Sequence, residues 1–259
     1  ETLQVRSLNN LVVALQNTGE YRQSITYLEK GIIITRKNGN KDQLLDCLSN
    51  MATAYAGLRK TDKALPYAQE SITLAEELKD SVFIINGLEI IAAAYKDLHK
   101  YDEAIRIYQR EIDLLNYLPS RLFENGRVNV NLGEVYSSMK KEKEAIALFL
   151  KGKKYFSQFG YPSGIQYANA ALADAYMKNN QLVEAQKIYN EILEINKSIQ
   201  DPELSSVSFN GLGIIKMQQN QYQEAFNHLK QAENIAKLAS LHIVLKDVYS
   251  NLNDLSCLQ

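Results

Sequence analysis

Apolar residues recur at spacings of three and four residues along most of the chain, as in Leu88, Ile91, Ala92 and Tyr95. This spacing places them on one face of an α-helix, whereas a half-buried strand would alternate apolar and polar residues. Short polar turns rich in Gly, Asn and Lys interrupt the pattern at regular intervals. The pattern therefore predicts an all-α protein made of helices joined by short turns.

The predicted helices form pairs that repeat. A small residue lies in the first turn of the second helix of each pair, and successive small residues are 40 or 41 positions apart. These residues are Ser24, Ala64, Ala104, Ala145, Ala185 and Ala225. A bulky residue follows four positions later in every pair except one, where Ala68 takes its place. A fixed period of this length predicts six helix-turn-helix repeats that share one continuous core.

The turn residues and prolines predict the boundaries. We expect first helices near 3–16, 42–58, 82–98, 121–138, 163–178 and 203–218, and second helices near 21–37, 62–78, 102–117, 142–158, 182–198 and 222–238. The corresponding repeats are 1–40, 41–80, 81–120, 121–161, 162–201 and 202–240. A terminal helix, within 241–259, caps the array or begins a seventh repeat, and the whole of 1–259 is read as a single domain. Pro66 is expected to delay or bend the start of its helix.

The residues Leu132-Gly133, Tyr136, Ala145, Phe149 and Gly152 resemble the signature of tetratricopeptide repeats. The resemblance implies a tetratricopeptide-type solenoid, an α-α superhelix whose first helices line a concave groove that binds a protein or peptide. The period is longer than the usual 34 residues and the signature Trp is absent, so the chain resembles the long-repeat branch of the family. HEAT-type repeats have a similar period but lack this order of small and aromatic residues, and they remain a remote alternative.

Composition narrows the range of partners. The chain has 29 Lys and Arg against 30 Asp and Glu, and no long basic run that would follow a phosphate backbone. We therefore expect no direct contact with nucleic acid. No apolar run is long enough to span a bilayer, so no membrane contact is expected from this sequence. The chain starts and stops inside helical patterns, which predicts a fragment of a longer protein and leaves localisation open.

The sequence offers little for catalysis. Its three histidines are not at metal-ligand spacing, and neither a Gly-rich phosphate loop nor a nucleophile motif is present. Cys47 lies on an apolar face and is expected to be a buried hydrophobe rather than a nucleophile. We therefore predict no enzymatic activity, no metal and no cofactor.

The groove implied by the resemblance supplies the candidate site. Asn10, Asn50 and Asn131 occupy the same position in three first helices. A side-chain amide can donate to and accept from one peptide unit of an extended ligand. The alternative is that each amide is solvated or bonds to the adjacent helix. The other predicted groove residues are Arg6, Glu89, Arg127, Glu134, Tyr167, Asp174 and Asn210.

The leading hypothesis is a non-enzymatic binding module that forms the signal-input region of a bacterial sensor kinase or transcriptional regulator. One alternative is a structural scaffold in a larger complex. A more remote alternative is a regulator with phosphatase activity whose catalytic bundle is absent. A homodimer through the terminal helices is also left open, because the last helix carries the apolar residues Val244, Val248, Leu252 and Leu255, which would be uncovered.

Overall fold

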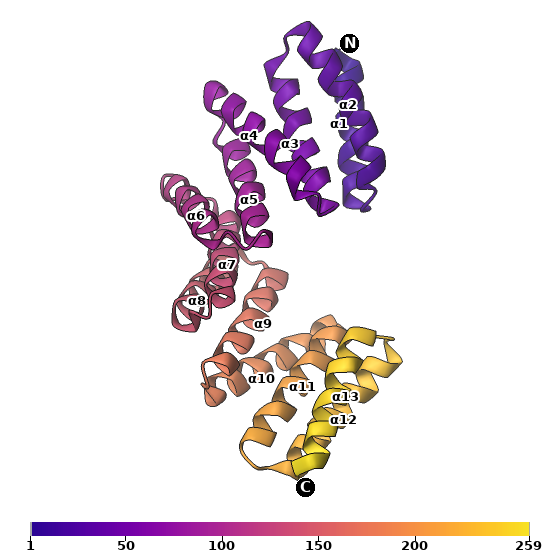
Figure 1. Cartoon of the computed structure of the whole chain (residues 1–259), viewed down its shortest axis with the longest axis vertical. Coiled ribbons are helices and arrows are strands. Elements are labelled where there is room, and N and C mark those ends of the chain that lie inside the picture. Colours follow the sequence, from indigo (N-terminus) through magenta and orange to yellow (C-terminus); the bar gives the residue numbers. More distant parts are fainter. Residues whose placement is uncertain (1, 259) are drawn as a thin grey trace. The chain divides into compact units, whose positions relative to one another are not determined.

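The computed structural model describes residues 2–258, and in this range every regular element is an α-helix (Figure 1). First and second helices follow one another in the predicted order, and each expected boundary lies within two residues of the observed one. The prediction of an all-α fold with six helix-turn-helix repeats and a C-terminal helix is confirmed. Two compact units make up the chain, Glu1–Val135 and Tyr136–Gln259, and each is described by itself. The single domain over 1–259 stays a prediction.

The first unit contains three complete helix pairs and most of a seventh helix. Its helices are α1 (Thr2–Asn17), α2 (Tyr21–Asn38), α3 (Lys41–Gly57), α4 (Thr61–Leu78), α5 (Ser81–Asp97), α6 (Tyr101–Asn116) and α7 (Leu122–Ser138), whose last turn lies beyond the unit. From α1 to α6 each helix packs against the next, and the first helices α1, α3 and α5 also pack against one another in order.

The second unit repeats this arrangement. Its helices are α8 (Glu142–Phe159), α9 (Pro162–Lys178), α10 (Leu182–Ile199), α11 (Pro202–Gln218), α12 (Tyr222–Leu238) and α13 (His242–Leu258). Each helix from α8 to α13 packs against the next, and α11 also packs against α13.

The small residues that define the repeat are all buried. Ser24, Ala64, Ala104, Ala145, Ala185 and Ala225 are at most 1% exposed. A Cβ atom added to Gly213 of α11 would lie 2.7 Å from Leu229 of α12, which is closer than carbon atoms can approach. Small residues therefore let the paired helix backbones approach, and the bulky residues beside them fill the remaining space.

Left-handed residues end the helices at the repeat period. Gly19, Asn180 and Asn220 have positive φ, a conformation that Gly and Asn adopt more readily than other residues. Positive φ also occurs within the repeats at Arg59, His99 and Lys140, and between repeats at Gly39, Lys79, Gly160, Gln200 and Ser240. Apart from the connection between α6 and α7, each turn therefore has one residue in a conformation that favours Gly or Asn.

Replacing Lys79 by Gly is expected to raise the free energy of unfolding by about 0.5–1 kcal/mol, because relief of the left-handed strain exceeds the greater flexibility of Gly in the unfolded chain. Lys79 has a φ of 58°, close to the 70° of Gly39 at the equivalent position one repeat earlier. Urea unfolding of the two proteins measures the difference. Lys60→Gly is the control, since Lys60 has a φ of −94° and should only lose stability. A loss for both variants would contradict the argument.

Two expectations are corrected by the structure. The helix that contains Pro66 is not delayed: α4 begins at Thr61 and continues past the proline to Leu78. The apolar residues Val244 and Val248 of α13 are not uncovered either.

Helix α12 covers the apolar residues of α13. Val244, Val248 and Leu255 are at most 7% exposed, and Leu252 packs beside them against Ala232 and Leu229. A dimer was expected because these residues would be exposed, and that reason is wrong. Helix α13 packs its apolar residues against the preceding repeat, as a first helix does. The homodimer itself stays a prediction.

Candidate functional site

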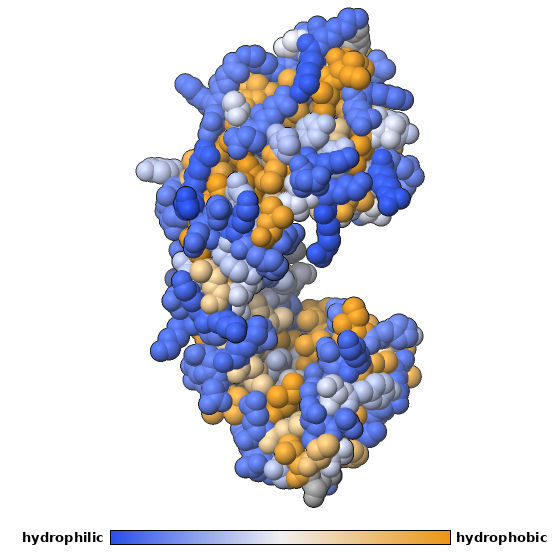
Figure 2. All heavy atoms as spheres, in the orientation of Figure 1, coloured by the Kyte–Doolittle hydropathy of each residue, from blue (hydrophilic) through white to orange (hydrophobic). Residues whose placement is uncertain are grey.

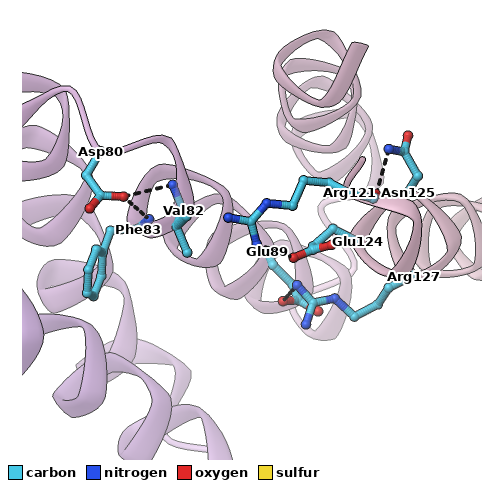
Figure 3. Close-up of polar contacts among 8 residues, drawn as sticks. All are labelled: Asp80, Val82, Phe83, Glu89, Arg121, Glu124, Asn125 and Arg127. Carbon is cyan, nitrogen blue, oxygen red and sulfur yellow. Dashed lines mark hydrogen bonds and ion pairs between the residues drawn. The ribbon is translucent and has the colours of Figure 1, made fainter. Parts of the chain in front are cut away.

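Two ion pairs join α5 to α7 in the first unit and bring together four of the predicted groove residues. Arg127 Nη2 lies 2.6 Å from Glu89 Oε2 (Figure 3). The Asn131 side chain also hydrogen-bonds to Glu89. Farther along the same helices, Lys96 Nζ lies 2.5 Å from Glu134 Oε2. We call these five residues the α5–α7 polar cluster.

Helix geometry explains why these residues meet. Arg127, Asn131 and Glu134 follow one another at steps of four and three along α7, so they share one face. Glu89 and Lys96 are seven positions apart on the facing side of α5. Their side chains are about one quarter exposed, so solvent screens them less than it screens surface pairs.

The environment of Glu89 combines opposing effects. Burial raises the pKa of its carboxyl, while the guanidinium of Arg127 and the hydrogen bond from Asn131 oppose the rise. Arg127 is held in turn by Glu89 and by the ring of Phe123, whose centroid lies 5.5 Å from the guanidinium carbon. A neighbouring pair, Arg121 and Glu124, lies 2.9 Å apart (Figure 3). Both charge signs are thus presented side by side on the first-helix face.

Glu111 of α6 is a charged residue beside this cluster that the sequence reasoning missed. Its exposed fraction is 0%, and neither carboxylate oxygen has a hydrogen-bond partner among the described residues. Burial is the largest cause that raises its pKa well above the usual range, and the carboxylate of Glu89 adds to the rise. Arg127 opposes it and Glu124 reinforces it. An unpartnered buried carboxyl is costly, so Glu111 is the most unusual polar group of this unit.

The repeat itself contains the signal that would have found Glu111. The residue lies seven positions after Ala104. The equivalent positions of the other repeats hold small or apolar residues, namely Gly31, Ser71, Gly152, Ile192 and Ala232. A carboxyl at a position that is otherwise small or apolar indicates one of two things. Either a side chain from another helix pairs with it, or its burial lowers the stability of the protein.

The other predicted residues of the first unit are not part of the cluster. Arg6 and Asn10 are exposed on α1. Asn50 is partly buried on α3, and its main-chain oxygen accepts a hydrogen bond of 2.8 Å from Gln16 Nε2. The role of the three amides in ligand binding stays a prediction.

The predicted residues of the second unit lie on α9 and α11. Tyr167 is 47% exposed on α9. Asp174 forms an ion pair of 2.6 Å with Lys178 one turn later, and both side chains are at least half exposed. Asn210 on α11 accepts a hydrogen bond of 2.8 Å from the Asn251 amide of α13, so the terminal helix already uses it.

Cys47 has the environment expected of a packing residue. Its exposed fraction is 0%, and burial raises the pKa of its thiol to about 11, with Asp46 adding to the effect. A thiol with so high a pKa is a poor nucleophile at neutral pH.

The described residues contain neither a candidate metal site nor a candidate membrane-spanning helix. Residues 2–258 contain no group of three or more His, Cys, Asp or Glu placed to hold a metal ion. Over the same range, none of the helices has the length and apolar character that crossing a bilayer requires. Hydrophobic and hydrophilic residues are interspersed on the visible face of each unit (Figure 2).

Family models for the tetratricopeptide repeat match most of the chain. One matches residues 3–77 and 166–237, which is more than half of the sequence, and a second matches residues 126–158. The chain therefore belongs to the tetratricopeptide repeat family. Repeats of this family are in general non-catalytic scaffolds for protein interaction. No curated protein sequence matches the chain.

Solved structures share the fold at low sequence identity. The apo form of RapI matches with a TM-score of 0.79 and 16% identity, over 98% of this chain and 71% of that one. A STAND protein with a tetratricopeptide repeat sensor, from Pyrococcus horikoshii, matches with a TM-score of 0.79 and 17% identity, over 94% of this chain but 38% of that one. A Rap protein complexed with competence and sporulation factor matches with a TM-score of 0.70 and 13% identity, over 98% and 75% of the two chains.

Proposed function

We propose that this chain is a non-catalytic binding module that holds a protein or peptide segment on the faces of its first helices. The observation that carries the proposal is the α5–α7 polar cluster, where the predicted groove residues Glu89, Arg127 and Glu134 are partly exposed members of ion pairs and Asn131 lies beside them. The side chains of both ion pairs are about one quarter exposed. A ligand can therefore reach these charges from solvent.

The chemistry of the cluster suits an extended chain. Arg127 offers several parallel donors, Glu89 offers acceptors, and the Asn131 amide offers one of each. Together they match the alternating donors and acceptors of a peptide backbone or a pair of charged side chains. The Rap structure solved with competence and sporulation factor supports the idea that this fold accommodates a ligand.

Replacing Arg127 and Asn131 by Ala is expected to weaken ligand binding about tenfold or more, since hydrogen bonds to charged groups contribute about 1.5–3 kcal/mol each. The probes are peptides selected on the native protein from a displayed random library, and fluorescence anisotropy gives their affinities. Asn50→Ala tests the second predicted amide in the same assay.

Matched controls separate binding from folding. Arg106 on α6 and Asn190 on α10 are exposed residues of second helices, so Arg106→Ala and Asn190→Ala should leave affinity unchanged. Circular dichroism checks that each variant keeps its helices. If well-folded Arg127 and Asn131 variants bind the selected peptides with unchanged affinity, the proposal is wrong.

The setting we propose for this module is the input region of a larger bacterial regulatory protein, a sensor kinase or a transcriptional regulator. The support is the fold shared with RapI and with the STAND sensor, of which this chain covers 38%. Sequencing the complete gene tests the setting. A kinase, DNA-binding or similar output domain beside the repeats is expected, and a gene that encodes only a subunit of a constitutive complex would favour the scaffold alternative.

A further inference from the structure

A pocket of about 320 Å³ lies in the second unit where α9, α10 and α11 meet. Its apolar surface comes from Ile192, Leu204 and Val207, and its polar groups come from Asp174, Tyr189 and Glu203. Asp174 is one of the predicted groove residues, but its spacing along the helix does not indicate that it borders a cavity. The pocket combines an apolar lining with two carboxylates.

Tyr189 is the buried polar group of this pocket. Its exposed fraction is 9%, and its hydroxyl has no hydrogen bond to any residue in the described part of the chain. Burial, and secondarily the Asp174 carboxylate, raises the pKa of this phenol to about 12. The hydroxyl therefore stays protonated at neutral pH and can both donate and accept.

Gly211 explains how the tyrosine reaches this place. A Cβ atom at Gly211 would lie 2.2 Å from Tyr189 Cζ and 2.6 Å from its hydroxyl oxygen. Only a residue without a side chain lets the ring lie against the backbone of α11. Three other first helices, α1, α3 and α7, carry Asn10, Asn50 and Asn131 at the equivalent position. The Tyr189 hydroxyl thus places a polar group where those repeats have an amide.

The charge of the pocket is negative and weakly compensated. Glu203 lies in the first turn of α11 and forms no ion pair within residues 2–258. Asp174 pairs with Lys178, but both side chains are at least half exposed, and such surface pairs contribute little. A positively charged group that entered the pocket would meet two carboxylates without displacing a strong internal pair.

We propose that this pocket takes one basic side chain, arginine or lysine, of a bound peptide or protein. The aliphatic stem of that side chain lies over Ile192, Leu204 and Val207, where its burial is favourable. Its cationic head lies among Asp174, Glu203 and the Tyr189 hydroxyl. The inference rests on the proposed function, because it assigns one ligand side chain to the first-helix face of the second unit.

A nuclear magnetic resonance titration tests the pocket without any knowledge of the natural ligand. The probes are N-acetyl-arginine methylamide and N-acetyl-lysine methylamide at millimolar concentration, read through the amide signals of Val207, Ser208 and Gly211. The uncharged norleucine analogue serves as the probe control, since it keeps the stem and lacks the charge. We expect saturable shifts for the basic probes and at least about fivefold weaker binding of norleucine.

Variants assign the binding to these side chains. Asp174→Asn with Glu203→Gln is expected to weaken the basic probes about five- to tenfold, and Tyr189→Phe about threefold. Glu194→Gln on α10 is the matched control, because Glu194 is 71% exposed and does not line the pocket. Equal affinity for norleucine and arginine, no shifts at these amides, or no effect of the Asp174 and Glu203 changes would overturn the inference.

The two proposals fail in distinguishable ways. If selected peptides do not depend on Arg127 and Asn131 while the basic probes still bind beside Tyr189, the proposed function fails and the pocket stands. If selected peptides depend on the α5–α7 polar cluster but the basic probes do not bind, the pocket proposal fails alone.

Discussion

Phe149→Ala is expected to lower the free energy of unfolding by about 3–5 kcal/mol, as measured by urea denaturation. Phe149 is 2% exposed on α8 and lies four residues after the small Ala145. Removing the ring leaves a cavity that the neighbouring helices cannot fill without losing their close approach. Because repeats are stabilised by their neighbours, the loss should also weaken the repeats that flank it.

Leu150→Ala on the same helix is the matched control for this prediction. Leu150 is 46% exposed, so its truncation removes much less buried surface and should cost under about 1 kcal/mol. Hydrogen exchange of α8 and α9 amides reports where stability is lost. Equal losses for the two variants would show that the repeat pattern does not identify the core.

Glu111→Met is expected to raise the free energy of unfolding at pH 7 by about 1–4 kcal/mol, because an apolar side chain of similar size replaces an unpartnered buried carboxyl. Glu111 is 0% exposed and occupies a position that is small or apolar in the other repeats. Thermal and urea unfolding measure the change. Asp113→Asn, an exposed acid on the same helix, should have no comparable effect.

The pH dependence follows from the direction of the pKa shift of Glu111. Its folded pKa is raised above the usual 4.5. Below that usual value the carboxyl is neutral in both states, so the native protein has no penalty there. As pH rises toward and through the folded pKa, the unfolded chain releases its proton more readily and stability falls.

Glu111→Gln removes this titration and should flatten the fall in stability above pH 4.5. Glu89, whose pKa is also raised, remains in both proteins, so the difference between the two curves reports Glu111 together with its coupling to Glu89. Parallel curves for the native protein and the Gln variant would show that Glu111 finds a partner that keeps it ionised in the folded state.

Much of the fold follows from the spacing of residues along the sequence. The two helices of a pair are neighbours in the sequence, and the small residue and the bulky residue recur at fixed offsets in all pairs but the one with Ala68. The observed helix boundaries are therefore close to those expected from the turns, and the breaks carry residues such as Asp80, whose side chain caps α5 (Figure 3). The expected delay at Pro66 is wrong, because packing of α4 against α3 and α5 holds the helix past a residue that disfavours it.

The candidate site follows only partly from the sequence. Spacing places Arg127, Asn131 and Glu134 on one face of α7, but it says nothing about which side chain of α5 each will meet. The partnership of Asn210 with Asn251 depends on how the terminal helix docks. The position of Tyr189 depends on the missing Cβ of Gly211, which matters only once α10 lies against α11.

The sequence by itself determined the class of fold, the repeat length and the helix boundaries, and it predicted a set of groove residues on the first helices. This was possible because the same spacing of small and bulky residues recurs in six repeats. Only the tertiary structure decided which of those residues are already paired, that Glu111 is a buried carboxyl without a hydrogen-bond partner among the described residues, and that a cavity opens beside Tyr189. These depend on distances between side chains of different helices, which no spacing along one helix records.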